Sequence, residues 1–213
     1  MRKMGMFVLM CVLASAVLAG CGSSGAERSV PDGWQEHASG GFSVALPERW
    51  KVVDVKEEGI DAVWDLLEGV DTEWARTATA MLSAERMKEM IQFWAMDSEP
   101  AGFGYAIAIV MRQDIPFPMS AEDLCVQMPA AYEQLGVDLV DTECGLTING
   151  LGAVRFMVRL PAGALAVKES QYVFVGEDTL WTLTFGVDET KWSEYEPTFA
   201  TAAESFRITG AVP

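Results

Sequence analysis

The sequence predicts an α+β protein in which a mainly antiparallel β-sheet is covered by helices on both faces, as a three-layer α/β/α sandwich. Two turn signals support a sheet rich in hairpins, because Asn149-Gly150 and Gly176-Glu177-Asp178 each separate two apolar runs. Helical patterns lie before and after these hairpins along the chain. That order favours an antiparallel sheet with helices packed against it.

The chain begins with a segment typical of an exported protein. A short basic head precedes an apolar run over Met4–Ala19, and its 16 residues are fewer than the roughly 18 to 20 that a permanent membrane-spanning helix needs. The run ends in Leu18-Ala19-Gly20-Cys21, which resembles the lipobox of bacterial lipoproteins. This resemblance implies that residues 1–20 are a removed signal peptide and that Cys21 carries the lipid anchor, palmitate included. The alternative is an ordinary secretory signal cut near Ala19, which also exports the protein.

A flexible tether is predicted to follow the anchor. Residues 21–33 hold the lipidated cysteine and a stretch rich in Gly, Ser, Pro and charge, and about twelve such residues span about 20 Å on average. Residues 34–213 are then expected to form one domain, because no further linker divides them and half of the chain is apolar. We expect the protein at the cell membrane or outer membrane, facing the periplasm or the cell exterior.

The charge of the chain restricts its partners. There are 15 basic and 31 acidic residues, a net charge of −16, and loss of Arg2 and Lys3 with the signal makes it −18. A domain this acidic is repelled by anionic lipid headgroups and by nucleic acid. Membrane attachment is therefore expected through the lipid on Cys21, and nucleic-acid binding is excluded.

The N-terminal half of the domain is predicted to begin with short strands. Phe42, Val44 and Leu46 alternate with small or polar residues, which is the period of a strand, and Pro47 ends it. Apolar residues at helical spacing then indicate two helices, and a continuous apolar run indicates a central strand buried on both faces. The expected elements are strands over 34–37, 42–46 and 50–55, helices over 60–67 and 72–95, and a strand over 105–111.

The C-terminal half is predicted to contain the hairpins between two helices. Ser120–Asp123 has the pattern of a capping box and opens a helix that closes at Gly136, with a kink expected at Pro129. Ser193–Glu196 has the same pattern and opens the final helix. The apolar side of that helix holds Tyr195, Phe199, Ala202 and Ala203. The expected strands cover 137–148, 153–160, 171–175 and 180–187, with a short strand or docked tail over 206–208.

Three motifs carry a resemblance to a known fold. Gly41–Trp50 is similar to the "GFSV-x-(L/I/V)-P-x-x-W" opening of many bacterial lipoproteins, and Ile148–Leu151 and Ser205–Ile208 match as well. In this order, over about residues 34–208, they resemble the PsbP-like fold shared with the Ran-binding Mog proteins. The resemblance implies an accessory or binding protein, as in photosystem subunits and a nuclear-transport factor. It implies no reaction.

The sequence offers no catalytic constellation. Its single histidine, His37, has no G-x-S-x-G or S-x-x-K serine to pair with, and neither H-E-x-x-H nor a paired C-x-x-C is present. The acidic stretch over 54–73 is predicted to be a solvated helix face. Binding of a hard cation by its carboxylates stays open, although the EF-hand spacing is missing. We expect no enzyme, no metal site and no cofactor.

Large apolar side chains are the candidates for a binding surface. Packing in the core is the first interpretation for them, and lining a groove for a partner or an apolar ligand is the second. Spacing alone does not separate the two. The candidate residues are Trp34, Trp50, Trp74, Met81, Met87 and Met90.

Cys125 and Cys144 are the cysteines that remain once the signal is removed and Cys21 is lipidated. Export to an oxidising space favours a disulfide between them, which would stabilise the fold by roughly 3 kcal/mol. Measured from a reversal at Gly136, they lie about 16 Å back along a helix and about 26 Å along a strand. A bridge therefore requires the helix kink or a shifted strand to bring the Cα atoms within about 7 Å.

Taken together, these features predict a lipid-anchored, extracytoplasmic, non-catalytic binding or accessory module with a protein partner in the cell envelope. A small-ligand or cation carrier is the alternative, which an apolar cavity or an oxygen-lined cluster would mark. A carboxylate- or hydroxyl-dependent hydrolase is a further alternative. A buried carboxylate with a raised pKa at the bottom of a pocket would mark the hydrolase.

Overall fold

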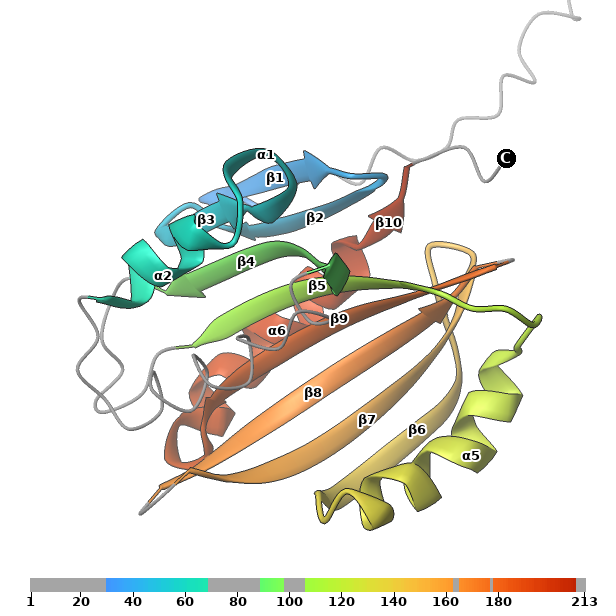
Figure 1. Cartoon of the computed structure of the whole chain (residues 1–213). Helices are drawn as coiled ribbons and strands as arrows, with labels where there is room; N and C mark the ends of the chain where they lie inside the picture. The colour runs from blue at the N-terminus through green and yellow to red at the C-terminus, as the bar shows by residue number, and fades with distance from the viewer. Residues whose placement is uncertain (1–29, 69–88, 98–105, 163–164, 177, 210–213) are drawn as a thin grey trace, which may run out of the picture.

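The strands form two antiparallel sheets in the computed structural model, which describes residues 30–68, 89–97, 106–162, 165–176 and 178–209 (Figure 1). The small sheet has the order β1-β2-β10 and the large one β3-β4-β5-β9-β8-β7-β6. The strands are β1 (Trp34–Ser39), β2 (Phe42–Pro47), β3 (Trp50–Asp54), β4 (Ile91–Asp97), β5 (Ile107–Asp114), β6 (Asp138–Ile148), β7 (Leu151–Ala162), β8 (Leu165–Val175), β9 (Thr179–Asp188) and β10 (Arg207–Ile208). The α+β class with mainly antiparallel sheets is confirmed.

Five helical segments accompany the sheets in the described part of the chain: α1 (Val55–Glu58), α2 (Asp61–Glu68), α5 (Ala121–Gln134), the 3₁₀ turn η1 (Glu189–Lys191) and α6 (Trp192–Ser205). Strand β3 ends one residue earlier than expected because Asp54 begins a helix. Its Oδ1 accepts hydrogen bonds from the backbone N–H groups of Lys56 and Glu57, at 3.0 and 3.2 Å. Within the described ranges, none of the helices has the length and apolar character to cross a bilayer.

The small sheet is built around β2. Strands β1 and β2 pair across the Gly40-Gly41 turn, whose residues have φ of 53° and 98°, and β10 pairs with the other edge of β2. Positive φ favours glycine, so the local sequence sets this hairpin. Phe42, Val44 and Leu46 are fully buried, and this strand and the docked tail at 207–208 agree with the sequence prediction.

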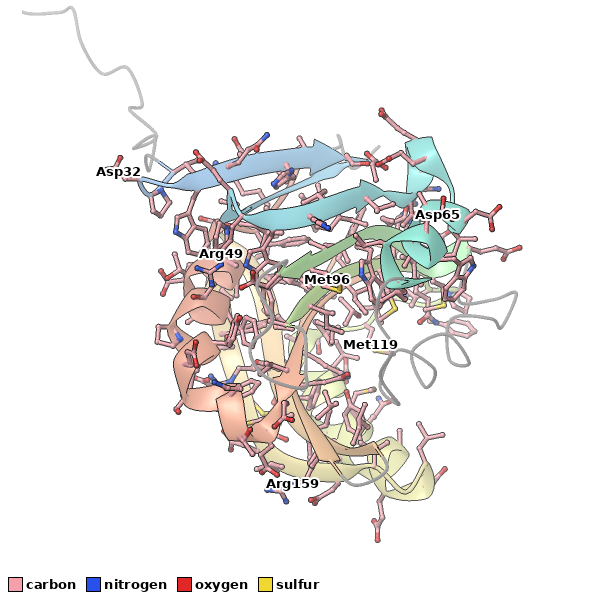
Figure 2. The ribbon with its side chains drawn as sticks, turned by 90° about the vertical axis from the view of Figure 1, so that its left-hand side faces the viewer. Asp32, Arg49, Asp65, Met96, Met119 and Arg159 are labelled. Atoms are coloured by element: carbon pink, nitrogen blue, oxygen red, sulfur yellow. A yellow bond between two sulfur atoms is a disulfide. The ribbon has the colours of Figure 1, made fainter. Side chains whose placement is uncertain are left out.

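Helices α6 and α5 pack against different side chains of the large sheet. Phe199 of α6 stacks on Phe185 of β9, with ring centroids 5.0 Å apart. Tyr132 of α5 packs instead on Phe156 of β7, at 5.5 Å. A third cluster joins α1 and α2 to β4 and β5. In Figure 2, Arg49 lies on the side of the strands that carries α6, and Asp65 of α2 lies on the other side.

The helix expected over 72–95 is wrong in its last part, because β4 begins at Ile91. Residues 72–88 lie outside the described part of the chain. Every residue of β4 is buried: Phe93 belongs to the α6 cluster, whereas Trp94 belongs to the α2 cluster. A strand buried on both faces has no polar alternation, so its apolar residues also fit helical spacing.

The capping of α5 is confirmed, whereas that of α6 is not as expected. Ser120 and Asp123 form the capping box of α5, which continues through Pro129 to Gln134. The N-cap of α6 is Lys191, without a side-chain hydrogen bond, so Ser193 does not cap this helix. Asp188 caps the preceding turn η1 instead, and its Oδ1 accepts a hydrogen bond from the Thr190 N–H at 2.8 Å. Helical structure therefore begins where β9 ends, before the predicted start.

Candidate functional site

An open cleft of about 700 Å³ lies between α6 and the β6–β7 hairpin. Ligand sites in proteins commonly have volumes of about 300 to 1,000 Å³, so the cleft can hold a ligand or a segment of a partner. It combines apolar and charged side chains. The side chains that line it include Leu146 and Ile148 of β6, Arg155 of β7, Tyr172 of β8, Ala200 and Ala203 of α6, and the carboxylates of Glu143 and Glu204.

Arg155 is the cation of this cleft, and two carboxylates of β6 hold it. Its Nη2 lies 3.0 Å from Oε2 of Glu143 and 3.4 Å from Oδ2 of Asp141. Burial opposes the charge, but Tyr172 and the two carboxylates outweigh this and raise the pKa of Arg155. Nε of Arg155 is buried and has no hydrogen-bond partner. The surrounding protein covers this N–H group, so a ligand in the cleft does not reach it.

Two irregularities in β6 bring these carboxylates to the cleft. The register with β7 shifts between Leu139 and Asp141 and again between Glu143 and Leu146. Each shift adds one residue to β6, which turns the following side chains to the other face. The first shift places Asp141 opposite Met157, which packs in the α6 cluster, whereas Leu139 lies opposite Val158 of the α5 cluster. The sequence contains no clear signal for these shifts, apart from Gly145 with φ of 72°.

Asn149 closes one end of the cleft. It lies in the β6–β7 turn with φ of 51°, and its Nδ2 donates to the backbone carbonyls of Glu204 and Phe206, both at 2.8 Å. Carbonyls at a helix C-terminus lack partners within the helix, so the side chain caps α6 from the hairpin. The turn was predicted from the sequence, but this contact across 55 residues was not.

The chain enters the domain beside the same helix end. A smaller pocket of about 140 Å³ lies there, and Val30 and Pro31 line it together with Ser205 and Arg207. Glu204 lines both this pocket and the cleft. The cleft therefore opens next to the point where the N-terminal segment joins the fold.

The ion pair between half-exposed Arg49 and buried Asp97, together with Tyr195 of α6, joins this helix to the large sheet. Asp97 of β4 is fully buried and accepts hydrogen bonds from Arg49 Nη2 at 2.8 Å and from the Tyr195 hydroxyl at 2.9 Å. Burial and the hydrogen bond to Asp97 raise the pKa of Tyr195 to about 12. Both hydrogen bonds leave the carboxylate paired, so we assign this cluster to fold stability.

Glu169 of β8 meets one of the two conditions for a hydrolase, a buried carboxyl with a raised pKa, but not the other, a place at the bottom of a pocket. Burial raises its pKa, and the Gln171 amide donates to its Oε2 at 2.8 Å. The Tyr132 hydroxyl in turn donates to Gln171 Oε1 at 2.6 Å. Glu169 lines neither of the two pockets described above. Nothing in the described structure places a substrate against it.

The predicted binding residues that lie in the described part of the chain, Trp34, Trp50 and Met90, do not form an exposed surface. Trp50 is only 5% exposed and packs edge-on against Phe199, while Trp34 is partly buried against the same core. Met90 is half-buried, and Trp74, Met81 and Met87 lie outside the described residues. The large apolar side chains that are exposed in the described ranges are Val30, Phe117, Val126, Leu135 and Val140.

Cys125 of α5 and Cys144 of β6 form a disulfide, with Cα atoms 6.0 Å apart. The path lengths from Gly136 differ by about 10 Å for a regular helix and strand. The register shifts in β6 reduce this difference, because each extra residue lengthens the chain without advancing the strand. Cys144 lies within the second shift, and its partner Cys125 packs against the α5 cluster.

The remaining polar candidates form no site in the described residues. His37 is half-buried on strand β1 at the edge of the small sheet, its ring lies 5.8 Å from that of Phe93, and burial lowers its pKa. In the part of the chain that the structure describes, no three His, Cys, Asp or Glu residues gather as metal ligands would. Of the acidic stretch, residues 69–73 lie outside that part.

No protein-family model matches the sequence, and no curated protein matches it. Among solved structures, the chain is similar to cyanobacterial PsbP (CyanoP) from Synechocystis sp. PCC 6803, with 18% identity and a TM-score of 0.49 over 90% of this chain and 98% of that one. It is also similar to LpqN, involved in cell envelope biogenesis of Mycobacterium tuberculosis, with 11% identity and a TM-score of 0.48 over 83% and 92%.

Proposed function

We propose that this protein is a lipid-anchored, extracytoplasmic binding or accessory module, and that the cleft between α6 and the β6–β7 hairpin is its binding site. The cleft carries this proposal, because its volume of about 700 Å³ lies in the range of ligand sites and its walls combine apolar and charged side chains. No catalytic step is part of the proposal.

The location rests on the N-terminal segment. Residues 1–20 are the signal peptide, Cys21 carries the lipid, residues 21–33 tether the domain, and residues 34–213 form a single domain. A disulfide between Cys125 and Cys144 supports an oxidising compartment outside the cytoplasm. The lipid holds the domain at the membrane, and the protein partner lies in the cell envelope.

The three-layer α/β/α arrangement is part of this proposal. The α6 cluster uses Tyr172 and Phe174 of β8, whereas the α5 cluster uses the intervening Val173. Successive side chains of a strand point to opposite faces, which supports helices on both faces of the large sheet. The small sheet shares one of those faces with α6, because Phe42 belongs to the α6 cluster.

Filling the cleft tests the proposed binding site. Ala200 is exposed on α6 and lines the cleft, so Ala200→Trp should occupy it without disturbing the core. Ser193→Trp adds the same side chain to an exposed position of α6 outside the cleft and is the matched control. In-cell crosslinking and mass spectrometry should recover protein partners with the native chain and with Ser193→Trp, but not with Ala200→Trp.

Two outcomes would contradict this assignment. If Ala200→Trp folds, reaches the membrane and still captures the same partners, the cleft is not the binding site. If instead a small molecule copurifies with the native protein and is lost only from Ala200→Trp, while crosslinked partners are unchanged, the carrier function holds. The cleft volume of about 700 Å³ is what favours the carrier as the second candidate.

A further inference from the structure

Asn149 is the one asparagine of the chain, and a glycine follows it. Both residues are exposed in the turn between β6 and β7, so water reaches them. The backbone N of the residue after an asparagine can attack Cγ of the asparagine side chain, because the ring that forms is small and unstrained. Glycine has no side chain to obstruct this attack. Asn149-Gly150 therefore has the composition and the exposure of a deamidation site.

The fold restrains the amide that would react. Nδ2 of Asn149 donates to the backbone carbonyls of Glu204 and Phe206, both at 2.8 Å. Ring closure makes Cγ tetrahedral and then expels Nδ2, so both hydrogen bonds have to break first. Each hydrogen bond stabilises the unreacted state. The amide is consequently free to react when the β6–β7 hairpin and the end of α6 separate.

The same end of α6 is also held to the small sheet. Ser205 Oγ accepts a hydrogen bond from the backbone N–H of Ala45 at 2.8 Å and donates to the Ala202 carbonyl at 2.6 Å. The bond to Ala45 joins residues 160 positions apart, so it forms only when this end of the helix is docked. Local opening of a helix end requires less free energy than unfolding of the whole domain. The docking of α6 therefore sets how often Asn149 is released.

We propose that Asn149 is a spontaneous modification site whose reaction is gated by the docking of α6. The backbone N of Gly150 attacks Cγ of Asn149, and a bond between these two atoms forms. The Cγ–Nδ2 bond breaks, and Nδ2 leaves as ammonia with the proton of the Gly150 N–H. One water molecule then opens the cyclic imide at either of its carbonyls, which gives aspartate or isoaspartate.

Either product detaches the hairpin from the helix. A carboxylate does not donate, so the carbonyls of Glu204 and Phe206 lose their donor and face a negative charge at a helix C-terminus. Isoaspartate also adds a methylene to the main chain between the paired residues Ile148 and Leu151. Because Asn149 and Glu204 both line the cleft, the modification opens one end of it irreversibly. Its effect on partner binding rests on the function proposed above, whereas the reaction does not.

Timed incubation of the full-length protein in detergent, followed by peptide mapping at residue 149 by mass spectrometry, tests the gate. A blocked peptide of residues 147–152 gives the rate without the fold. The native protein should convert at least about ten-fold more slowly than the peptide, because two hydrogen bonds hold the amide. Ser205→Ala should speed the conversion several-fold. Thr201→Ala is the matched control with no change expected, since its hydroxyl bonds only within α6, to the Pro197 carbonyl.

A second measurement covers a Ser205→Ala variant that fails to fold. Guanidinium chloride below the unfolding midpoint should raise the rate in the native protein towards that of the peptide. Equal rates in native protein and peptide would overturn the inference, because the hydrogen bonds would then not protect the amide. A rate that neither Ser205→Ala nor mild denaturant changes would overturn the gate. So would native protein that stays unconverted in both conditions while the peptide reacts completely.

Partner capture separates this inference from the proposed function. Asn149→Asp carries one of the two product side chains, and it should capture fewer partners than the native chain in the crosslinking experiment. Unchanged capture by Asn149→Asp, with capture still lost in Ala200→Trp, would overturn the effect on the cleft and leave the proposed function standing. Capture that persists in Ala200→Trp contradicts the proposed function, and the rates at residue 149 then decide the modification alone.

Discussion

Glu169 on β8 is a carboxyl that folding partly removes from water, and burial raises its pKa. The unfolded chain therefore loses this proton at a lower pH than the folded protein. Below the unfolded pKa both states are protonated, and stability falls as the pH rises from there towards the folded pKa. Glu169→Gln keeps the shape of the protonated side chain without its charge. We expect it to raise the urea midpoint of unfolding at about pH 8 and to leave it unchanged at about pH 4.

Glu133→Gln at an exposed position of α5 is the control for this substitution. It should change the urea midpoint little at either pH. A lower midpoint for Glu169→Gln at about pH 8 would mean that the carboxylate form of Glu169 stabilises the fold, contrary to the effect of its burial.

Asn149 combines two roles in one side chain, because it adopts a positive φ and donates to two carbonyls at the end of α6. Asn149→Asp tolerates the same backbone conformation but removes both donors and adds a negative charge near a helix C-terminus. We expect it to lower the free energy of unfolding by about 2 kcal/mol, measured by urea denaturation. Asn149→Gly separates the roles, since it loses the hydrogen bonds and keeps the turn. A neutral effect of both variants would contradict the capping role.

The same residue illustrates what the sequence can predict at this scale. The Asn149-Gly150 pair identifies a tight hairpin because its backbone preference is local. The contact of the side chain with Glu204 depends on how a distant helix packs, and no local pattern records that. The unpartnered Nε of Arg155 belongs to the same class, because it is defined only by neighbours on β6 and β8.

At the scale of elements, caps and turns were predictable and strands buried on both faces were not. The α5 capping box and both hairpins follow from residues within a few positions of one another. Strand β4 was predicted as a helix, because burial on both faces removes the alternation that identifies a strand. The two register shifts in β6 were also missed. Since those shifts place Asp141 and Glu143 beside Arg155, the cleft itself was not predictable from the sequence.

The disulfide between α5 and β6 fixes a helix to the edge strand of the large sheet. Replacing both Cys125 and Cys144 with serine should lower the free energy of unfolding by about 3 kcal/mol in urea, because the loop that they close is no longer constrained in the unfolded chain. Native protein without reductant should show no free thiol from these residues on titration with Ellman's reagent. Two titratable thiols in that sample would reject the bridge.

Strands β8 and β9 approach closely at Gly186. A Cβ added there would lie 3.3 Å from Cγ of Glu169 and 3.3 Å from Cγ1 of Ile107. Gly186→Ala should therefore overpack the sheet and lower the free energy of unfolding by about 1 to 2 kcal/mol in urea denaturation. Gly152→Ala is the matched control, because its Cβ would meet only the Ala121 side chain, at 3.8 Å. Equal stability of the two variants would show that the strands separate without cost.

Across the whole molecule, the tether and the cleft lie at the same end of α6. Val30 and Pro31 line a pocket with Glu204, and Glu204 also borders the cleft. Val30 follows Cys21 by nine positions in the sequence, a reach of at most about 30 Å when fully extended. If the lipid is on Cys21, Val30 stays within about 30 Å of the bilayer surface. The cleft lies beside Val30, because Glu204 borders both. A partner that binds the cleft is therefore expected to present its binding segment near the membrane.

The anchor itself gives the last prediction. Two or more acyl chains hold a protein stably at a bilayer, whereas this acidic domain has no basic surface to replace them. Cys21→Ser should therefore release the protein from the membrane fraction or leave it as unprocessed precursor. Cys11→Ser, within the apolar run of the signal, is the matched control and should remain anchored. Cell fractionation and intact mass measure both variants, and a native chain that begins elsewhere without a lipid would contradict the assignment of Cys21.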